Sequence, residues 1–256
     1  MKITLIGAGR VASRVGPRLK EAGHTIVAVY SRTLEHAREL AATVDAPAFD
    51  RLEVLPEADV YLTMLCDDAL TALASDIVKV CPDALFLHTA GSIPMDVWKE
   101  AGAKCYGVLY AMQTFSKGIK IDWTQVPVFI EGSSSTELES IKKLALELSP
   151  NVTPLSSKGR KKLHVAAVFT CNFTNHMYAI SEQLLKEEGI PFSVMLPLVR
   201  ETARKVENLS PVAAQTGPAV RGDRKVINEH LELLSEHKEY AELYRLISTD
   251  INKELK

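Results

Sequence analysis

The sequence has few cysteines, few aromatic residues and no long apolar run. Its cysteines, Cys66, Cys81, Cys105 and Cys171, are far apart and show no C-x-x-C spacing, which argues against a zinc site and against a disulfide framework. No apolar stretch approaches the ~20 residues that a membrane-spanning helix needs. Lys2 leads directly into a strand-like run, which is not the pattern of a cleaved signal peptide. We therefore expect a cytoplasmic protein with reduced thiols and no metal site.

An excess of charge of one sign is also lacking. The 256 residues contain 30 Lys and Arg against 32 Asp and Glu, which gives a formal net charge of −2. This balance provides no reason to expect binding to nucleic acid or to an anionic membrane, so we predict a small-molecule substrate. The length is sufficient for one large domain or two smaller ones with a full core.

The start of the chain has the pattern of a nucleotide-binding turn. A strand-like run, residues 2–6, is followed by Gly7-x-Gly9-x-x-Ala12 and then by helical spacing. In a strand–turn–helix, Gly7 permits the tight turn, Gly9 lets the backbone approach a diphosphate, and Ala12 lets the helix pack close to the strand. The alternative is an ordinary structural turn. The predicted cofactor contacts of this turn are Gly7, Ala8, Gly9, Arg10 and Val11.

The end of the second predicted strand, residues 25–30, indicates which dinucleotide is bound. Ser31, Arg32 and Thr33 follow this strand. Sites for NAD usually carry an acidic residue here, whereas a guanidinium suits the 2′-phosphate of NADP. We therefore predict NADP, held in part by these three residues. The alternative is that Arg32 is a solvated residue at a helix start.

Further strand-like runs alternate with helical segments, which predicts a doubly wound, mainly parallel sheet. The runs are residues 46–49, 58–65, 84–87, 103–109, 126–130 and 151–155. Ligands of such sheets bind at the carboxyl ends of the strands. This rule brings Gly7, Ser31, Cys66, His88 and the segment after Leu109 to one edge, with Cys66 and Thr89 as further cofactor contacts. The alternative to a functional role for His88 is that it is a hydrogen-bonded loop histidine.

From residue 157 the pattern is helical, so we predict a Rossmann domain at 1–156 and an all-helical domain at 157–256. Pro17 is expected to kink or stop the first helix, and Pro197 to interrupt a helix at 194–209. A helix over 158–188 is apolar on nearly all sides. Such a helix is expected to be buried inside one chain or between two, which predicts a homodimer formed through the helical domain.

The same helix carries a polar stripe of Lys161, His164, Asn172, Asn175 and His176, within an arc of about 120°. Polar groups on a buried helix need partners, because each unpaired group costs roughly 1–3 kcal/mol. If the stripe faces the nucleotide edge, His164 is the candidate general acid or base and Asn172 the group that holds the substrate. Alternatively, these side chains satisfy each other or a neighbouring helix.

Two parts of the chain resemble known families. The N-terminal half resembles the NADP-binding domain of pyrroline-5-carboxylate reductases and F420-dependent NADP oxidoreductases, and the C-terminal half is similar to the all-helical DUF2520 domain. Such proteins are related more distantly to 6-phosphogluconate and 3-hydroxyisobutyrate dehydrogenases, which often dimerise through their helical domains. The motifs that carry the resemblance are Gly7-x-Gly9-x-x-Ala12, Ser31-Arg32, Ala58-Asp59-Val60, Asp67-Asp68-Ala69, His88-Thr89-Ala90-Gly91, Met112-Gln113-Thr114-Phe115, His164-x-Ala166-Ala167, Asn172-Phe173 and Thr216-Gly217-Pro218-Ala219-x-Arg221-Gly222-Asp223.

The chain departs from these families at two places. Tyr110-Ala111 stand where the family tends to have a His-Pro pair, so the acid–base role of that histidine is lost. The distant dehydrogenases have a lysine and an asparagine one turn apart on the long helix, but the residue four positions after Lys161 is Val165.

Together, the residues and the resemblance predict hydride transfer between NADP(H) and a small carbonyl, imine or alcohol in an interdomain cleft. His164, Asn172 and His88 are the predicted catalytic residues, and His88 and Thr89 would line the nicotinamide side. Gln113 and Thr216 are candidate substrate contacts. The alternatives are an NADP-binding sensor without chemistry and an F420-linked reductase.

Overall fold

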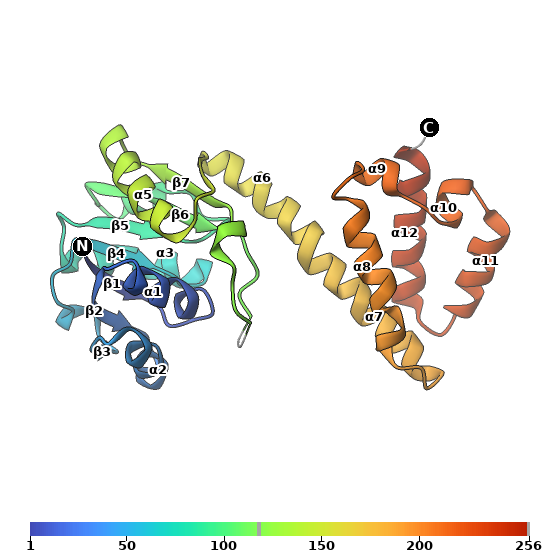
Figure 1. Ribbon diagram of the computed structural model, residues 1–256, viewed down its shortest axis with the longest axis horizontal. Helices are drawn as coiled ribbons and strands as arrows, with labels where there is room; N and C mark the ends of the chain where they lie inside the picture. Colours follow the sequence, from blue (N-terminus) through green and yellow to red (C-terminus); the bar gives the residue numbers. More distant parts are fainter. Residues whose placement is uncertain (117–118, 255–256) are drawn as a thin grey trace. The chain divides into compact units, whose positions relative to one another are not determined.

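The computed structural model describes residues 1–116 and 119–254, and the chain forms two compact units, Met1–Asn172 and Phe173–Lys256. Unit 1 contains an eight-stranded sheet of order β3-β2-β1-β4-β5-β6-β7-β8 (Figure 1). This is the mainly parallel, doubly wound arrangement that the sequence predicts. The strands are β1 (Lys2–Ile6), β2 (Thr25–Tyr30), β3 (Ala48–Phe49), β4 (Val60–Thr63), β5 (Leu85–His88), β6 (Cys105–Ala111), β7 (Val128–Gly132) and β8 (Val152–Pro154).

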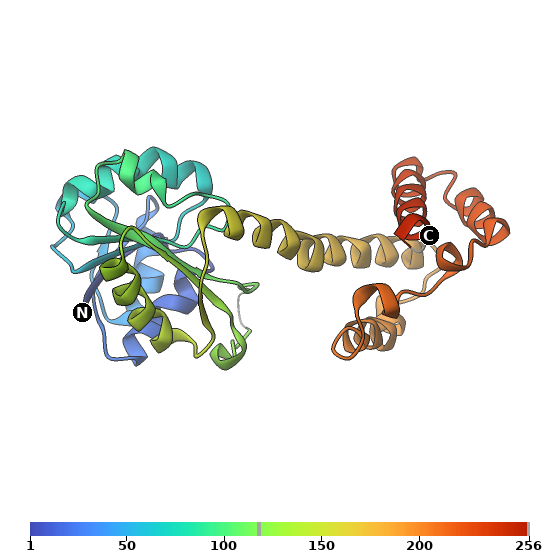
Figure 2. The same cartoon turned by 90° about the horizontal axis from the view of Figure 1, so that it is seen from above.

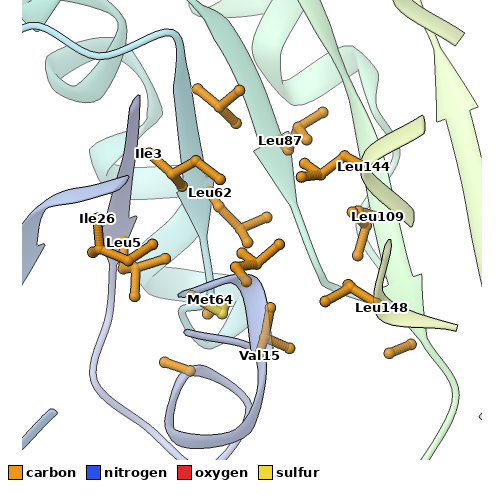
Figure 3. Packing of buried hydrophobic residues seen from close by; sticks show 14 of the residues in the cluster. Ile3, Leu5, Val15, Ile26, Leu62, Met64, Leu87, Leu109, Leu144 and Leu148 are labelled. Carbon is orange, nitrogen blue, oxygen red and sulfur yellow. The ribbon is translucent and has the colours of Figure 1, made fainter. Parts of the chain in front are cut away.

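Helices cover both faces of the sheet (Figure 2). One face packs against α1 (Ala12–Glu21), α2 (Leu34–Val44) and α5 (Ser135–Leu148). The other packs against α3 (Asp67–Val80) and α4 (Asp96–Glu100). Side chains alternate between the two faces along each strand. The first core therefore takes Leu5, Leu62 and Leu87 (Figure 3), and the second takes Ile6, Tyr61 and Phe86.

β7 is the first strand that reverses direction. It pairs antiparallel with β6, and β8 then pairs parallel with β7. In the part of the connection from β6 to β7 that the structure describes, residues 112–116 and 119–127, the only helical element is the short 3₁₀ turn η2 (Trp123–Gln125). Parallel strands are usually joined by a crossover that contains an α-helix, and the described part of this connection contains none, which agrees with the antiparallel pairing of β7.

The first helix does not stop at Pro17, so that part of the prediction was wrong. α1 continues through Pro17, because Val15 and Leu19 on either side of it are fully buried and hold the helix against the sheet despite one lost hydrogen bond. Pro197 lies in the first turn of α8 (Leu196–Lys205), where a proline favours the start of a helix.

The predicted long helix is formed, but it is not buried within the chain. Its helical residues comprise α6 (Ser157–Ala167), the π-helical turn η3 (Val168–Phe173) and α7 (Thr174–Glu187). Arg160 is the one buried residue of α6, and Val165 is 56% exposed. An apolar composition predicts burial only if another surface covers it, and the described residues leave more than half of Val165 uncovered. The domain boundary between residues 156 and 157 coincides with the N-cap of α6 and stays a prediction.

Unit 2 is helical, as predicted. It contains α7, the 3₁₀ turn η4 (Phe192–Met195), α8, α9 (Pro211–Ala214), α10 (Pro218–Arg221), α11 (Arg224–Leu233) and α12 (Lys238–Glu254). The Asp223 carboxylate accepts a hydrogen bond from the Val226 N–H at 3.3 Å and so caps α11. Among the residues that the structure describes, no helix has the length and apolarity to cross a bilayer.

Candidate functional site

The turn between β1 and α1 requires glycine at one position and leaves open space at another. Gly7 has a φ of +108°, and a Cβ there would come within 2.5 Å of the Met64 carbonyl oxygen. The Gly7 N–H donates to the Tyr30 carbonyl at 2.8 Å, which ties the turn to β2. A Cβ at Gly9 would meet no protein atom within 4 Å. The turn therefore brings backbone N–H groups to an accessible helix start, which is the arrangement that suits a diphosphate.

The segment after β2 lies at the same end of the sheet. The Ser31 hydroxyl accepts a hydrogen bond from the Thr33 N–H at 3.3 Å, and Thr33 occupies the N-cap position of α2. Arg32 between them is exposed. The hydrogen bond orders the backbone on both sides of Arg32 and leaves the guanidinium at the surface.

The ends of β4 and β5 place the other predicted cofactor contacts. Cys66 is exposed at the N-cap position of α3. Thr89 is half-buried, and its N–H donates to the Thr63 carbonyl at 3.1 Å. Both residues follow adjacent strands, as the parallel-sheet rule predicts.

His88 is fully buried and does not line the cavity described below. Its Nδ1 accepts a hydrogen bond from the Ala90 N–H at 3.2 Å, and its ring centroid lies 6.2 Å from that of Trp98. Burial, assisted by the positive charge of Arg160, lowers the pKa of His88 to about 3. A neutral, enclosed imidazole suits the ordering of the loop after β5 rather than proton exchange with a substrate.

A cavity of about 600 Å³ lies within unit 1. It is lined by the glycine turn, by the end of β6 with the residues that follow it, and by the second half of α6 with η3. It brings together five of the residues singled out from the sequence, which are Arg10, Val11, Gln113, His164 and Asn172. Residues separated by more than 150 positions thus meet around one space.

His164 is held from two sides. Its Nδ1 lies 3.4 Å from the Tyr110 hydroxyl, and the two rings meet edge to face at 6.4 Å and 73°. On the other side is Gly91, where a Cβ would come within 2.6 Å of Nδ1 and 2.9 Å of Cγ. The Nδ1–Cγ edge of the imidazole therefore faces Gly91, and Nε2 lies farther from it.

A buried ion pair anchors α6 one turn before His164. Arg160 is 1% exposed and donates from Nη1 to the Glu131 carboxylate at 2.6 Å. The same guanidinium donates to the carbonyls of Ile93 at 2.6 Å and of Ala90 at 3.2 Å. Arg160 thereby connects α6, the end of β7 and the loop that contains Gly91.

Ser157 completes the anchor. Its N–H and hydroxyl donate to the two carboxylate oxygens of Glu131 at 2.7 and 2.6 Å, and its hydroxyl accepts from the Met95 N–H at 3.0 Å. Sequence reasoning missed this network, since Arg160 stands in a run of basic residues that reads as a solvated helix start. The sequence clue to the start of this helix was Ser156, because serine is a frequent N-cap residue. In the structure its hydroxyl accepts a hydrogen bond from the Gly159 N–H at 3.2 Å.

The π turn η3 carries the second predicted catalytic residue, Asn172, which is exposed and lines the cavity. A π turn adds one residue to the local winding and often marks a functional segment. The predicted stripe assumes ideal α periodicity across this turn, and of its members His164 and Asn172 line the same cavity. His176 and Thr216 both lie in unit 2, where they line other cavities.

Gln113 lies directly after β6. Its side-chain oxygen accepts a hydrogen bond from the Thr114 N–H at 2.8 Å, which leaves the amide N–H groups as donors. Arg14 of α1 donates to the Ser116 carbonyl at 2.7 Å. This bond ties the segment after β6 to the helix of the glycine turn.

Comparison with known proteins agrees with this architecture. Residues 2–87 match the family described as NADP oxidoreductase, coenzyme F420-dependent, and residues 126–251 match the domain of unknown function DUF2520. The crystal structure of a protein from Bacteroides fragilis, named a "putative NADP oxidoreductase", is 48% identical to this chain, with a TM-score of 0.93 over 98% of both chains.

Two more distant similarities were found. An imine reductase from Myxococcus stipitatus, solved with NADP+, has a TM-score of 0.72 at 17% identity, covering 99% of this chain and 93% of its own, which is a likeness of fold. A glutamyl-tRNA reductase from Idiomarina loihiensis is 40% identical over 65 residues, or 24% of this chain. That match spans 15% of the length of the curated relative.

Proposed function

The chain belongs to the NADP oxidoreductase family of the Bacteroides fragilis protein, and on this premise we propose that it transfers a hydride between NADP(H) and a small carbonyl, imine or alcohol substrate. The observation that carries the proposal is the cavity of about 600 Å³ that joins the glycine turn to His164. Phosphate-binding backbone and an ionisable imidazole on one cavity are what a nicotinamide-dependent reaction requires of a protein.

The glycine turn fits the dinucleotide. The clash that a Cβ at Gly7 would make with Met64 keeps the backbone tight, and the free space at Gly9 allows a diphosphate to approach the N-terminus of α1. When bound, the nicotinamide supplies or accepts the hydride. Arg10 and Val11 would then contact the cofactor from the cavity side.

His164 is the proposed proton donor and acceptor, and Asn172 the group that orients the polar atom of the substrate. Support comes from their common cavity and from the contacts that hold the imidazole between Tyr110 and Gly91. General acid–base catalysis by a positioned side chain contributes typically 10²–10⁴-fold to a rate. Gln113 is proposed to donate from its amide to the substrate. His88 is proposed to act indirectly, by ordering the loop that contains Thr89 and Gly91.

We expect Arg32→Ala to weaken NADP+ binding about 10- to 100-fold and to leave NAD+ binding unchanged. The reason is the loss of a charged hydrogen bond to the 2′-phosphate, worth about 1.5–3 kcal/mol. Isothermal titration calorimetry with both cofactors measures the difference. The matched control is Arg38→Ala, which removes another exposed arginine from α2. Equal loss for NAD+ and NADP+ would contradict the proposed role of Arg32.

The reaction is tested by NADPH oxidation against a panel of keto acids, aldehydes and cyclic imines. Turnover of one class, with the reverse reaction from the corresponding alcohol or amine, supports the proposal. Tight NADPH binding without turnover across the panel would indicate a sensor instead. Hydride exchange between NADP and the deazaflavin F420 would identify the F420-linked alternative.

We also propose that the protein is a homodimer in which a second copy covers exposed apolar helix residues. Val165 on α6 and Leu198 on α8 are 56% and 63% exposed, and a second copy that packed on these helices would remove such apolar side chains from water. We expect Leu198→Asp to shift the sedimentation coefficient from dimer to monomer. Leu146→Asp, at an exposed apolar position of α5, is the control and should leave the dimer intact. A monomeric wild-type protein at high concentration would overturn the proposal.

A further inference from the structure

Tyr110 has no chemical role in the reaction proposed above. It is the second-last residue of β6, it lines the cavity, and its hydroxyl lies 3.4 Å from Nδ1 of His164. Hydrogen bonds of catalytic groups are often long before substrate binds and then shorten. The sequence predicted the loss of a proton-transferring group at this position, whereas in the structure the Tyr110 hydroxyl lies beside the imidazole of His164.

A neutral imidazole cannot serve as a proton donor by itself. If His164 gives the proton on Nε2 to a substrate oxygen, the ring becomes an imidazolate unless Nδ1 receives a proton in the same step. An imidazolium has no such need, because it carries protons on both nitrogens. A site that works near neutral pH through a neutral histidine therefore needs a donor at Nδ1.

The Tyr110 hydroxyl meets this requirement. Burial raises the pKa of Tyr110, with the charge of Arg160 acting in the opposite direction, so the phenol keeps its proton at neutral pH. A phenol can donate to Nδ1 of a neutral imidazole and can accept from the Nδ1–H of an imidazolium. It can therefore remain hydrogen-bonded to His164 in both protonation states.

We propose that Tyr110 sets the tautomer of His164, with the imidazole proton on Nε2, and supplies a proton to Nδ1 as Nε2 protonates the substrate. This inference rests on the proposed function. In the step, the hydride forms a C–H bond at the substrate carbon, and the substrate oxygen takes the Nε2 proton. The O–H bond of Tyr110 breaks as an N–H bond forms at Nδ1. Solvent then returns a proton to Nε2 as the Nδ1 proton goes back to the phenolate, which restores the starting tautomer of His164 and the neutral phenol.

Several charged or titratable groups surround the imidazole and belong in any interpretation of its pH dependence. Arg10 reaches the same cavity from the glycine turn, and Cys171 from η3. Arg160 lies one turn away on α6, already paired with Glu131 from β7. On β6, the titratable side chain that contacts the imidazole of His164 is Tyr110.

The test is Tyr110→Phe, which removes one oxygen and retains the ring. At about pH 8.5, where an ordinary imidazole is neutral, kcat should fall at least about tenfold with little change in KM. At about pH 5.5, where an ordinary imidazole is protonated, kcat should be close to that of the wild type. Tyr106→Phe is the matched control, because it removes the same atom from a half-buried tyrosine four residues earlier on β6. A purely structural role for Tyr110 would lower kcat equally at both pH values, and that result would overturn the proposal.

A second measurement does not depend on turnover. In protein labelled with ¹⁵N-histidine, the ring nitrogens of His164 should report a proton on Nε2 at alkaline pH in the wild type, assigned by comparison with His164→Gln. In Tyr110→Phe the two tautomers should mix. A proton on Nδ1 in the wild type, or spectra unchanged by Tyr110→Phe, would overturn the inference. Absence of any NADPH oxidation by the wild type would instead contradict the proposed function. The ¹⁵N spectra would still test the proposed tautomer of His164 separately.

Discussion

Replacing Glu131 by alanine is expected to lower the free energy of unfolding of unit 1 by about 3–5 kcal/mol, because Arg160 would remain buried without its counter-charge. The guanidinium is 1% exposed, and Glu131 contacts it at 2.6 Å while also accepting two hydrogen bonds from Ser157. Urea unfolding followed by tryptophan fluorescence is the measurement. It reports on unit 1, since both tryptophans, Trp98 and Trp123, lie there.

The control for this prediction is an exposed ion pair. Asp83 and Lys104 are 2.7 Å apart but mostly exposed, so Asp83→Ala should change the unfolding curve little. The double variant Glu131→Leu with Arg160→Met should recover much of the lost stability, because it removes both charges from the interior. A Glu131→Ala protein as stable as the wild type would show that the pair contributes nothing to the fold.

Replacing His164 by alanine is expected to lower kcat by about 10²–10⁴-fold while the dissociation constant for NADPH stays within about twofold of the wild type. The imidazole lines the cavity from α6, whereas the proposed diphosphate site is the glycine turn before α1. Loss of the proton donor therefore affects the chemical step and spares cofactor binding. Steady-state kinetics combined with calorimetric titration of NADPH separates the two effects.

His176→Ala is the matched control for this substitution. His176 is exposed on α7 in unit 2, outside the cavity that contains His164, and should leave kcat unchanged. Turnover by His164→Ala at the wild-type rate would remove this residue from the mechanism. A large loss of NADPH affinity would show that it acts on the cofactor instead.

Features that depend on neighbouring residues were predictable from the sequence. The run from Lys2 to Gly9 contains its own strand, turn and helix signals, and the structure has them as β1, the glycine turn and α1. The mainly parallel sheet followed from the alternation of strands and helices and the right-handed crossover rule. His164 and Gln113 were both candidates from the sequence, and the structure places them on one cavity, while their roles stay predictions.

Features that depend on distant pairings were not predictable. Nothing near Arg160 indicates that Glu131, 29 residues earlier, would neutralise it in the interior. The sequence shows only that Tyr110 is a tyrosine where the related families tend to have a histidine. Its contact with His164, 54 residues later, forms only when the chain folds. The π turn at Val168–Phe173 also escaped detection, because helical periodicity assumes a constant 3.6 residues per turn.

The two edges of the sheet limit how copies of this chain can associate. At one edge β3 has only two residues, and at the other β8 has three and ends at Pro154, which has no N–H to offer. Neither edge is a good template for strand addition by a neighbouring molecule, the usual route to continuous intermolecular sheets and fibrils. If copies of this chain associate as proposed, we therefore expect them to do so through side-chain packing between helices, which a single charged substitution can disrupt.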